Sequence, residues 1–375
     1  QGVLIVKLSV YVKKKKTRLK QRMKYFSKIT ASHYVLPSKV LTNDDLAERF
    51  DPKKVKSIAK LSGITQRRVA PEGMTASDLA VAAAQRMIES ENIDRASIDM
   101  VVFVTQTPDY ILPATAFIVH EKLGLSKDCG AFDLSMGCPA MPYALSVVNG
   151  LITSGQCKIV LLIFSETITR LVYPKDRSLV TLHGDGAAAF ILEAADGDYG
   201  FEFADIHSDS SGWKHLLVPA GGMKQRISEE TKKETTDESG ICTTPESLQM
   251  NGAAVFHFSI SEIPPAVKAS LQKHSLSLDD CKLVLFHQAN KMMVDSIYNA
   301  LQVPQEKRFF FMEQIGNLSA ASTPVLLAEA LRQGKLDGGG RVLLASFGVG
   351  LTWGVFSLNF APGSVKASQA STELD

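Results

Sequence analysis

The feature of this sequence that most restricts its fold is an internal repeat with a shift of about 180 residues. Three segments of the first part return in the second part in the same order: 101–105 at 283–287, 139–154 at 320–333, and 159–164 at 342–346. Similar shifts between three pairs of elements are what the duplication of one unit produces. The repeated strands are almost unbroken apolar runs, which are typical of strands buried on both faces. We therefore predict two related halves, each a central sheet covered by helices, that share one core.

Hydrophobic periodicity and turn residues divide the chain further. Helices are predicted at 43–50, 53–61, 79–91, 114–123, 255–274 and 291–301, and further strands at 24–29, 131–134, 187–193 and 352–359. The α/β chain then has five segments: a disordered basic extension (1–22), an N-terminal half (23–195), a connecting excursion (196–250), a C-terminal half (251–362) and a flexible tail (363–375).

The charge is distributed unevenly along the chain. Residues 1–22 carry eight Lys and Arg side chains and no acidic one, while the whole chain has a net charge of only +2. Without this arm, residues 23–375 have a net charge of −6, which argues against nucleic-acid binding. We expect Met23 to be the natural start and the arm to be an extension outside the fold. No apolar run approaches the ~18 residues that a membrane span needs.

The cysteines indicate a reducing compartment. There are five in 375 residues, an odd number without the spacing of a disulfide framework or a metal site. A cytoplasmic location and the absence of a bound metal are the simplest expectations.

Cys138 is the strongest candidate for a reactive group. It follows an apolar strand at 130–134 and a turn through Gly137, and it precedes a long helix that ends near Ser154. Pro139 suits the first helical position, so Cys138 is expected at a helix N-terminus, among free N–H groups. The positive end of the helix dipole favours the thiolate, which is the nucleophilic form. The alternative is an inert buried cysteine.

Two polar residues of the second half are candidates to join Cys138. His287 ends the buried strand near 283–286, and strand ends are where sites gather in layered α/β folds. Asn317 lies in a glycine turn before a helix, at the place in the second half that Cys138 has in the first. The repeat predicts that the three side chains converge, and a thiol, an imidazole and an amide suit thioester chemistry. For each residue taken alone, an alternative stays open: His287 as a core histidine with satisfied hydrogen bonds, and Asn317 as an ordinary helix N-cap.

A glycine-rich connection at 346–354 could supply a backbone donor. It lacks the spacing of a dinucleotide fingerprint, and no helix follows it. An N–H group from this stretch would pair with the N–H of Cys138 as an oxyanion hole, whereas the plain alternative is a β-turn.

Together these motifs resemble the β-ketoacyl-ACP synthase III family of the thiolase superfamily. The resemblance covers about 23–360 and rests on five stretches in the family's order: 133–138, 184–187, 287–290, 316–322 and 347–354. It implies a duplicated five-layered αβαβα thiolase fold and a homodimer. Segment 218–222 and the insertion after it resemble divergent members from specialised-product or surface-polysaccharide gene clusters.

The resemblance also implies a reaction. Cys138 would take an acyl group from an acyl-CoA or acyl-ACP primer, with the amides of Cys138 and Val349 as the oxyanion hole. His287 and Asn317 would then stabilise the enolate formed from malonyl-ACP as CO2 leaves, giving a 3-oxoacyl-ACP. No cofactor is expected, because the substrates carry CoA or phosphopantetheine. The partners implied are acyl carrier protein and a second copy of the chain.

Four further residues correspond to substrate-binding positions of the family: Leu112 in the dimer loop, Arg177 on the nucleotide side, Phe256 and Asn290. The tryptophan and arginine that clamp the CoA adenine in well-known members correspond to Ser57 and Leu61, and a pantetheine-channel asparagine corresponds to Ala253. Lys291 is a candidate contact for the acidic carrier protein.

Two other functions remain open at this point. One is a non-decarboxylating acyltransferase of the same fold that forms an ester or amide from acyl-Cys138. The other is a non-catalytic binding or scaffold protein.

Overall fold

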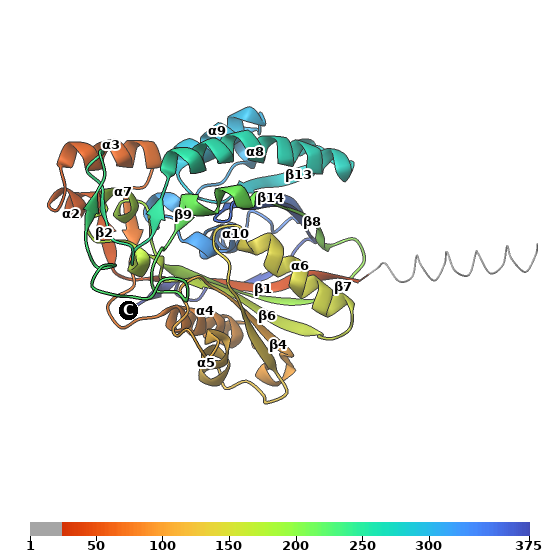
Figure 1. Cartoon of the computed structure of the whole chain (residues 1–375). Coiled ribbons are helices and arrows are strands. Elements are labelled where there is room, and N and C mark those ends of the chain that lie inside the picture. Colours follow the sequence, from red (N-terminus) through yellow and green to blue (C-terminus); the bar gives the residue numbers. More distant parts are fainter. Residues whose placement is uncertain (1–24) are drawn as a thin grey trace, which may run out of the picture.

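The computed structural model describes residues 25–375, which form five alternating layers of helix and sheet (Figure 1). The extension predicted over 1–22 lies outside the described residues. Within 25–375, no helix is long and apolar enough to cross a membrane.

The first sheet belongs mainly to the N-terminal half. Its strand order is β16 (Lys366–Ala367), β1 (Tyr25–Pro37), β7 (Gly186–Asp196), β6 (Ile159–Glu166), β4 (Met100–Val104) and β5 (Gly130–Leu134). Strand β4 is parallel to both β5 and β6, whereas β7 is antiparallel to β6 and β1. A seventh strand, β17 (Glu373–Leu374), also pairs with β1.

The second sheet repeats this pattern. Its order is β13 (Cys281–Phe286), β14 (Gly340–Gly348), β15 (Thr352–Phe360) and β8 (Gly200–Ser208), with β13 parallel to β14 and the other pairs antiparallel. The order and directions match those of β4, β6, β7 and β1. An isolated parallel bridge joins Val284 of β13 to Arg308. It has the position that β5 has beside β4 in the first sheet. The predicted duplication is therefore present in the strand pairing.

The middle layer is made of two helices that the repeat relates to each other. Helices α6 (Ala140–Thr153) and α10 (Ser322–Arg332) share one hydrophobic cluster with the inner faces of both sheets. In β6, Leu162 and Phe164 face this cluster, while Leu161 and Ile163 face the other side, as the two-residue period of a strand requires. The two halves therefore share a core.

The outer layers cover the remaining sheet faces. Helices α4 (Ala76–Ser90) and α5 (Thr115–Lys122) pack on the first sheet, and α8 (Gly252–Lys273) and α9 (Lys291–Ala300) pack on the second. Together with the central helices and the two sheets they complete the αβαβα order, which confirms the predicted fold (Figure 1).

The shorter elements lie at the edges of these layers. They are β2 (Val40–Thr42), α2 (Asn43–Ala47), α3 (Pro52–Ser62), β3 (Gln66–Arg68), α7 (Arg177–Val180), β9 (Leu216–Leu217), β10 (Thr235–Thr236), β11 (Cys242–Thr243) and β12 (Gln249–Met250).

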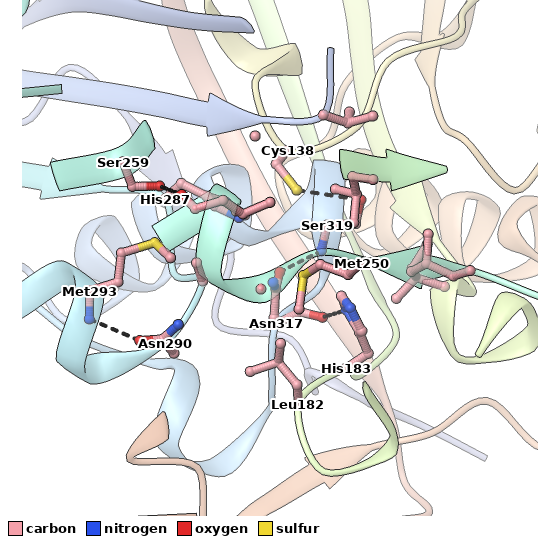
Figure 2. A pocket seen from close by; sticks show the side chains of 18 of the residues that line it. Cys138, Leu182, His183, Met250, Ser259, His287, Asn290, Met293, Asn317 and Ser319 are labelled. Atoms are coloured by element: carbon pink, nitrogen blue, oxygen red, sulfur yellow. Dashed lines mark hydrogen bonds between the residues drawn. The ribbon is translucent and has the colours of Figure 1, made fainter. Parts of the chain in front are cut away.

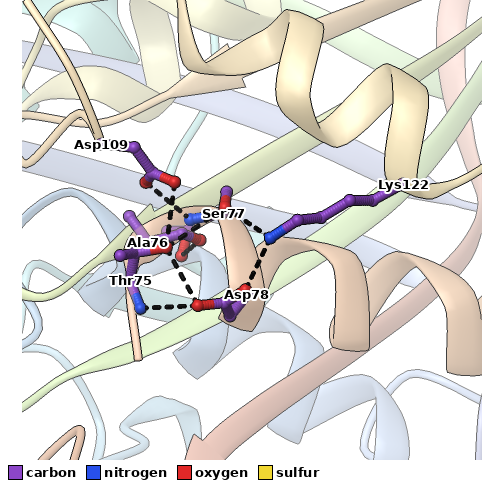
Figure 3. Close-up of polar contacts among 7 residues, drawn as sticks. Thr75, Ala76, Ser77, Asp78, Asp109 and Lys122 are labelled. Atoms are coloured by element: carbon purple, nitrogen blue, oxygen red, sulfur yellow. Dashed lines mark hydrogen bonds and ion pairs between the residues drawn. The ribbon is translucent and has the colours of Figure 1, made fainter. Parts of the chain in front are cut away.

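A polar cluster fixes the start of α4 to its neighbours (Figure 3). Thr75 and Asp78 form a capping box, and Lys122 of α5 forms an ion pair with Asp78 at 2.7 Å. The carboxylate of Asp109 accepts hydrogen bonds from the Thr75 hydroxyl at 3.0 Å and the Ser77 N–H at 3.2 Å. The loop that leaves β4 is thus anchored at Asp109, immediately before the exposed residues 110–112.

Three predicted boundaries are wrong. Strand β1 continues past the predicted end at 29 to Pro37, because it pairs with β7 as far as Val35 and with β17 beyond it. The excursion begins after β8, not at 196, because β8 is an edge strand of the second sheet. The tail over 363–375 is not free: β16 and β17 pair with β1, and Arg86 donates hydrogen bonds to the carbonyls of Ser371 and Glu373.

Candidate active site

The residues predicted to carry the chemistry line one cavity of about 610 Å³. Cys138, His287 and Asn317 all contribute to its wall, and they come from three segments far apart in the sequence (Figure 2). Most of the remaining wall is apolar, with Ile168, Leu171, Leu182, Leu216, Leu217, Leu248, Phe256 and Phe347 among its members. The cavity is a place where polar groups converge in surroundings of low polarity.

Cys138 lies in the turn between β5 and α6. The N–H of Ala140 donates to the carbonyl of Gly137 at 2.9 Å, and α6 begins at Ala140, so Pro139 is the N-cap and not the first helical residue as predicted. The Cys138 Sγ lies 3.9 Å from the hydroxyl oxygen of Ser319. The backbone of Gly348 approaches closely as well, since a β-carbon there would lie 3.2 Å from the Sγ.

Burial decides the protonation state of Cys138. Removal from water raises the pKa of this thiol to about 11, even though the Ser319 hydroxyl and two backbone N–H groups act to lower it. The buried residue is therefore a thiol at neutral pH, and burial opposes the thiolate that the helix terminus is expected to favour. A low-polarity cavity penalises an anion more than a short helix-end field favours it.

Two backbone donors face the sulfur. The N–H groups of Cys138 and Val349 lie near the Sγ, and both lower the pKa of the thiol. Val349 follows Gly348 at the end of β14, and it lines the cavity. A carbonyl carbon bonded to Sγ would hold its oxygen near these donors, which is the arrangement of an oxyanion hole.

His287 follows β13 and is fixed by its backbone, whose N–H donates to the carbonyl of Ala345 at 2.9 Å. Burial lowers the pKa of its imidazole to about 3, with a smaller contribution from neighbouring His183. The ring is neutral at physiological pH. Its Nδ1 is buried and has no hydrogen-bond partner within 25–375. A neutral ring that carries its proton on Nε2 can donate a hydrogen bond to a ligand in the cavity.

Asn317 is held through its carbonyl groups. Its side-chain oxygen accepts hydrogen bonds from the N–H of Ser319 and the hydroxyl of Ser322, each at 3.0 Å. With the oxygen occupied in this way, the amide NH2 is the end left to donate to a ligand. Gly316, in the turn before Asn317, has a φ of +81°. This left-handed conformation favours glycine over residues with a side chain.

The other predicted site residues divide into two groups. Phe256 and Asn290 line the cavity, and the Asn290 side chain also caps α9 by accepting from the N–H of Met293 at 2.8 Å. Arg177 is not part of the cavity wall; its guanidinium donates to the carbonyls of Ser239 and Gly240 in the excursion. Leu112 lies on the surface, where 80% of it is exposed.

Several polar residues of the cavity wall are not predicted from the sequence, among them Gln106, His183 and Ser319. His183 precedes the glycine turn at 184–186, and a histidine at that position is the signal that could have drawn attention to it. Ser319 follows Asn317 by two residues, and its role beside Cys138 depends on a contact between the two halves.

Comparison with known proteins agrees with this site. The sequence profile described as "3-Oxoacyl-[acyl-carrier-protein (ACP)] synthase III" matches residues 132–212, and the profile for the C-terminal part of the same family matches 271–360. The β-ketoacyl-[acyl-carrier-protein] synthase III of Natranaerobius thermophilus is 35% identical over 331 residues, which is 88% of this chain and 97% of the relative. The synthase III of Xanthomonas campestris is 35% identical over 335 residues, covering 89% of this chain and 98% of that protein.

Solved structures lead to the same family. The 3-oxoacyl-(acyl-carrier protein) synthase of Burkholderia xenovorans superposes with a TM-score of 0.85 at 32% identity, over 94% of this chain and 98% of that chain. The priming β-ketosynthase of the R1128 polyketide pathway has a TM-score of 0.79 at 28% identity, over 91% of this chain and 98% of its own. With Cys138, His287 and Asn317 in one cavity, the chain is an acyltransferase that belongs to the 3-oxoacyl-[acyl-carrier-protein] synthase III family.

Proposed function

We propose that this enzyme condenses an acyl primer with malonyl-ACP, with loss of CO2, to give a 3-oxoacyl-ACP. The observation that carries the proposal is the presence of a thiol and two neutral hydrogen-bond donors, His287 and Asn317, in one largely apolar cavity. The reaction needs no cofactor beyond the pantetheine arm of its own substrates.

The first half-reaction transfers the acyl group to Cys138. The sulfur attacks the thioester carbonyl, and the N–H groups of Cys138 and Val349 stabilise the negative charge on the oxygen. When the carbon–sulfur bond to the carrier breaks, the proton of the Cys138 thiol leaves with the departing thiol. No net charge is then left in the cavity, where charge is costly.

The second half-reaction uses the neutral donors. The malonyl thioester oxygen accepts hydrogen bonds from the His287 Nε2–H and the Asn317 amide, so the electron pair released with CO2 is stabilised as an enolate. The carbanion attacks the acyl carbon on Cys138, and the carbon–sulfur bond breaks to return the thiolate, which takes up a proton. A neutral imidazole is suited to this role because it donates without attracting the malonyl carboxylate.

A lysine-rich helix beside the cavity mouth is the surface we propose for an acidic carrier protein. Met292 lines the cavity and is 41% exposed, so it marks the mouth. The adjacent Lys291 lies against Gly63, where α3 ends. The exposed lysines of α3 are Lys53, Lys54, Lys56 and Lys60. Within the described part of the chain, none of these four has an ion-pair partner, whereas Lys291 pairs with Asp295 at 2.7 Å. Unpaired charges of one sign favour docking of the opposite sign.

We also propose that the enzyme is a homodimer in a reducing cytoplasmic compartment. Tyr110, Ile111 and Leu112 are 63%, 71% and 80% exposed, a cluster of apolar side chains that a partner surface would cover. The five cysteines are all free, as expected where thiols stay reduced.

Separating the two half-reactions tests the proposed function. The Cys138→Ala variant is expected to form no acyl adduct by intact-mass measurement, while it still releases CO2 from malonyl-ACP. The His287→Ala and Asn317→Ala variants are expected to form the adduct and to lose about 10²- to 10³-fold in CO2 release. Formation of an adduct in the unmodified enzyme, but no CO2 from malonyl-ACP, would instead identify a non-decarboxylating acyltransferase.

A further inference from the structure

Ser319 contacts the reacting sulfur, and the proposed reaction gives its hydroxyl no part. The Oγ of Ser319 lies 3.9 Å from the Sγ of Cys138, and Figure 2 shows this contact. Only 3% of Ser319 is exposed. Within residues 25–375, the Cys138 sulfur is the only hydrogen-bond partner of this hydroxyl. The contact between the two side chains therefore requires an account of its own.

The backbone of Ser319 adopts a conformation that is uncommon for a serine. Its φ is +51°, in the left-handed region that favours glycine. The Ser319 N–H donates to the side-chain oxygen of Asn317 at 3.0 Å, which holds the residue in this conformation. A serine at a position where glycine would fit with less strain indicates that its side chain has a use.

The direction of the hydrogen bond depends on the proton of the sulfur. A thiol can donate or accept, whereas a thiolate has no proton and can only accept. Beside a thiolate, the O–H of Ser319 must therefore be the donor. A hydrogen bond to an anion is roughly twice as strong as one between neutral groups. Among the groups that lower the pKa of the Cys138 thiol, the Ser319 hydroxyl has the largest influence.

We propose that Ser319 is a further catalytic residue, whose hydroxyl donates a hydrogen bond to the Cys138 sulfur when that sulfur carries negative charge. In the acylation, the thiol proton passes to the departing carrier thiolate, and the proton of the Ser319 hydroxyl stays on its own oxygen. In the condensation, the carbon–sulfur bond breaks and its electron pair returns to the sulfur. The same O–H then stabilises the thiolate until it takes up a proton. This inference rests on the proposed acylation of Cys138.

Substitutions that remove the hydroxyl test the inference. Ser319→Gly suits the φ of +51°, whereas Ser319→Ala keeps the β-carbon. Loss of the donor should reduce the thiolate fraction of Cys138 by roughly 10- to 100-fold, and the stronger nucleophilicity of the less stabilised thiolate offsets about half of this on a logarithmic scale. Both variants should therefore lower the maximal rate of Cys138 acylation by butyryl-CoA, measured by intact mass, by about 3- to 10-fold.

Two further readouts separate this role from a structural one. The butyryl-CoA concentration that gives half of the maximal rate should stay unchanged, because the hydrogen bond acts on the sulfur and not on the bound thioester. Iodoacetamide labelling of the Cys138 peptide, which needs no acyl substrate, should also be about 3- to 10-fold slower in both variants between pH 7 and 10.

Ser357→Ala is the control for the loss of a buried hydroxyl. Ser357 lies in β15, outside the cavity wall, and its hydroxyl donates to the Glu202 carboxylate at 2.6 Å. This variant should be acylated at the rate of the unmodified enzyme.

The inference alone would be overturned by maximal rates within twofold of the unmodified enzyme in both Ser319 variants, or by a loss confined to Ser319→Ala. A changed half-saturating concentration with an unchanged maximal rate would overturn it as well. If the unmodified enzyme forms no adduct with butyryl-CoA or butyryl-ACP, the proposed function fails instead, and an unchanged rate of iodoacetamide labelling would then count against Ser319 separately.

Discussion

Gly348 and Cys138 are in contact through the backbone of one and the side chain of the other: a β-carbon at position 348 would lie 2.7 Å from the Cys138 Cβ. The contact joins the end of β14 in the second half to the turn before α6 in the first. It brings the N–H of Val349 to the sulfur, so the close approach is a condition for the proposed oxyanion hole.

Gly348→Ala should therefore slow the acylation of Cys138 by about 10²- to 10³-fold, because the new methyl group forces the Val349 donor away from the reacting carbonyl. The rate of adduct formation measured by intact mass checks this. Gly150→Ala is the matched control: a β-carbon at 150 meets nothing within 4 Å, and alanine favours the helix by roughly 0.5–1 kcal/mol. Equal acylation rates in the two variants would contradict the role assigned to Gly348.

The raised pKa of Cys138 predicts the pH dependence of its reaction with a small neutral alkylating agent. Since the pKa is about 11, the thiolate fraction should rise by roughly tenfold for each pH unit between 7 and 10, without a plateau. Labelling of the Cys138 peptide with iodoacetamide, followed by mass spectrometry, measures this dependence. A plateau below pH 8 would mean that the helix terminus and the backbone donors outweigh burial.

His183 should make the protein less stable in acid. Its folded-state pKa of about 4 lies below the ordinary value of 6.5, so between these values the unfolded chain binds more protons and stability falls as the pH falls. At pH 5 the loss should be about 2 kcal/mol relative to neutral pH, from 1.36 kcal/mol per pH unit. Urea unfolding of the unmodified protein and of His183→Phe, each at pH 7 and pH 5, tests this. The contributions of the other titratable groups cancel when the loss of stability between the two pH values is compared between the two proteins.

That difference should show a smaller acid-induced loss for His183→Phe. Buried Glu166 acts in the opposite direction in both proteins, because burial raises the pKa of its carboxyl to about 8. The folded protein then binds more protons than the unfolded chain, so its stability rises as the pH falls from 8 toward the ordinary pKa of 4.5. The same loss of stability in both proteins would show that His183 is not buried as a neutral ring.

Reversing charge on α3 should weaken the use of malonyl-ACP. The Lys53→Glu/Lys56→Glu double variant is expected to raise the KM for malonyl-ACP by about 3- to 10-fold, and less so at high salt, because the lost attraction acts across solvent. Acylation by a CoA primer should be unchanged, since the cavity is intact. The Lys127→Glu/Lys158→Glu control alters two exposed lysines that precede β5 and β6 of the first sheet. An equal effect of both double variants would exclude α3 as the docking surface.

The exposed loop before α5 should determine the oligomeric state. Ile111→Asp/Leu112→Asp is expected to convert the dimer to monomers in sedimentation velocity, because two carboxylates would be desolvated in the apolar contact. Ile227→Asp changes a single apolar residue of the excursion that is 60% exposed, and it should leave the dimer intact. A monomeric unmodified protein, or a dimer that survives the double change, would contradict the proposed interface.

Much of the architecture follows from the sequence alone. Local patterns and their spacing predict the duplication and the order of helices and strands, because strand and helix periodicities depend on neighbours a few residues apart. The repeat then predicts the convergence of Cys138, His287 and Asn317. The predicted extents of most helices agree with the structure to within a few residues; α8, for example, spans Gly252–Lys273 where 255–274 is predicted.

Tertiary structure decided what depends on distant neighbours. The tail pairs with β1 because that edge of the first sheet has free backbone groups, which composition does not reveal. Arg177 binds the excursion because two loops far apart in sequence meet at that point. The sequence predicts Cys138 as the nucleophile, but burial has the largest influence on the pKa of its thiol, and burial is a property of the packed molecule. For the same reason, the neutral state of the His183 ring follows from its burial beside Asn317, whose carbonyl oxygen lies 3.2 Å from Nδ1.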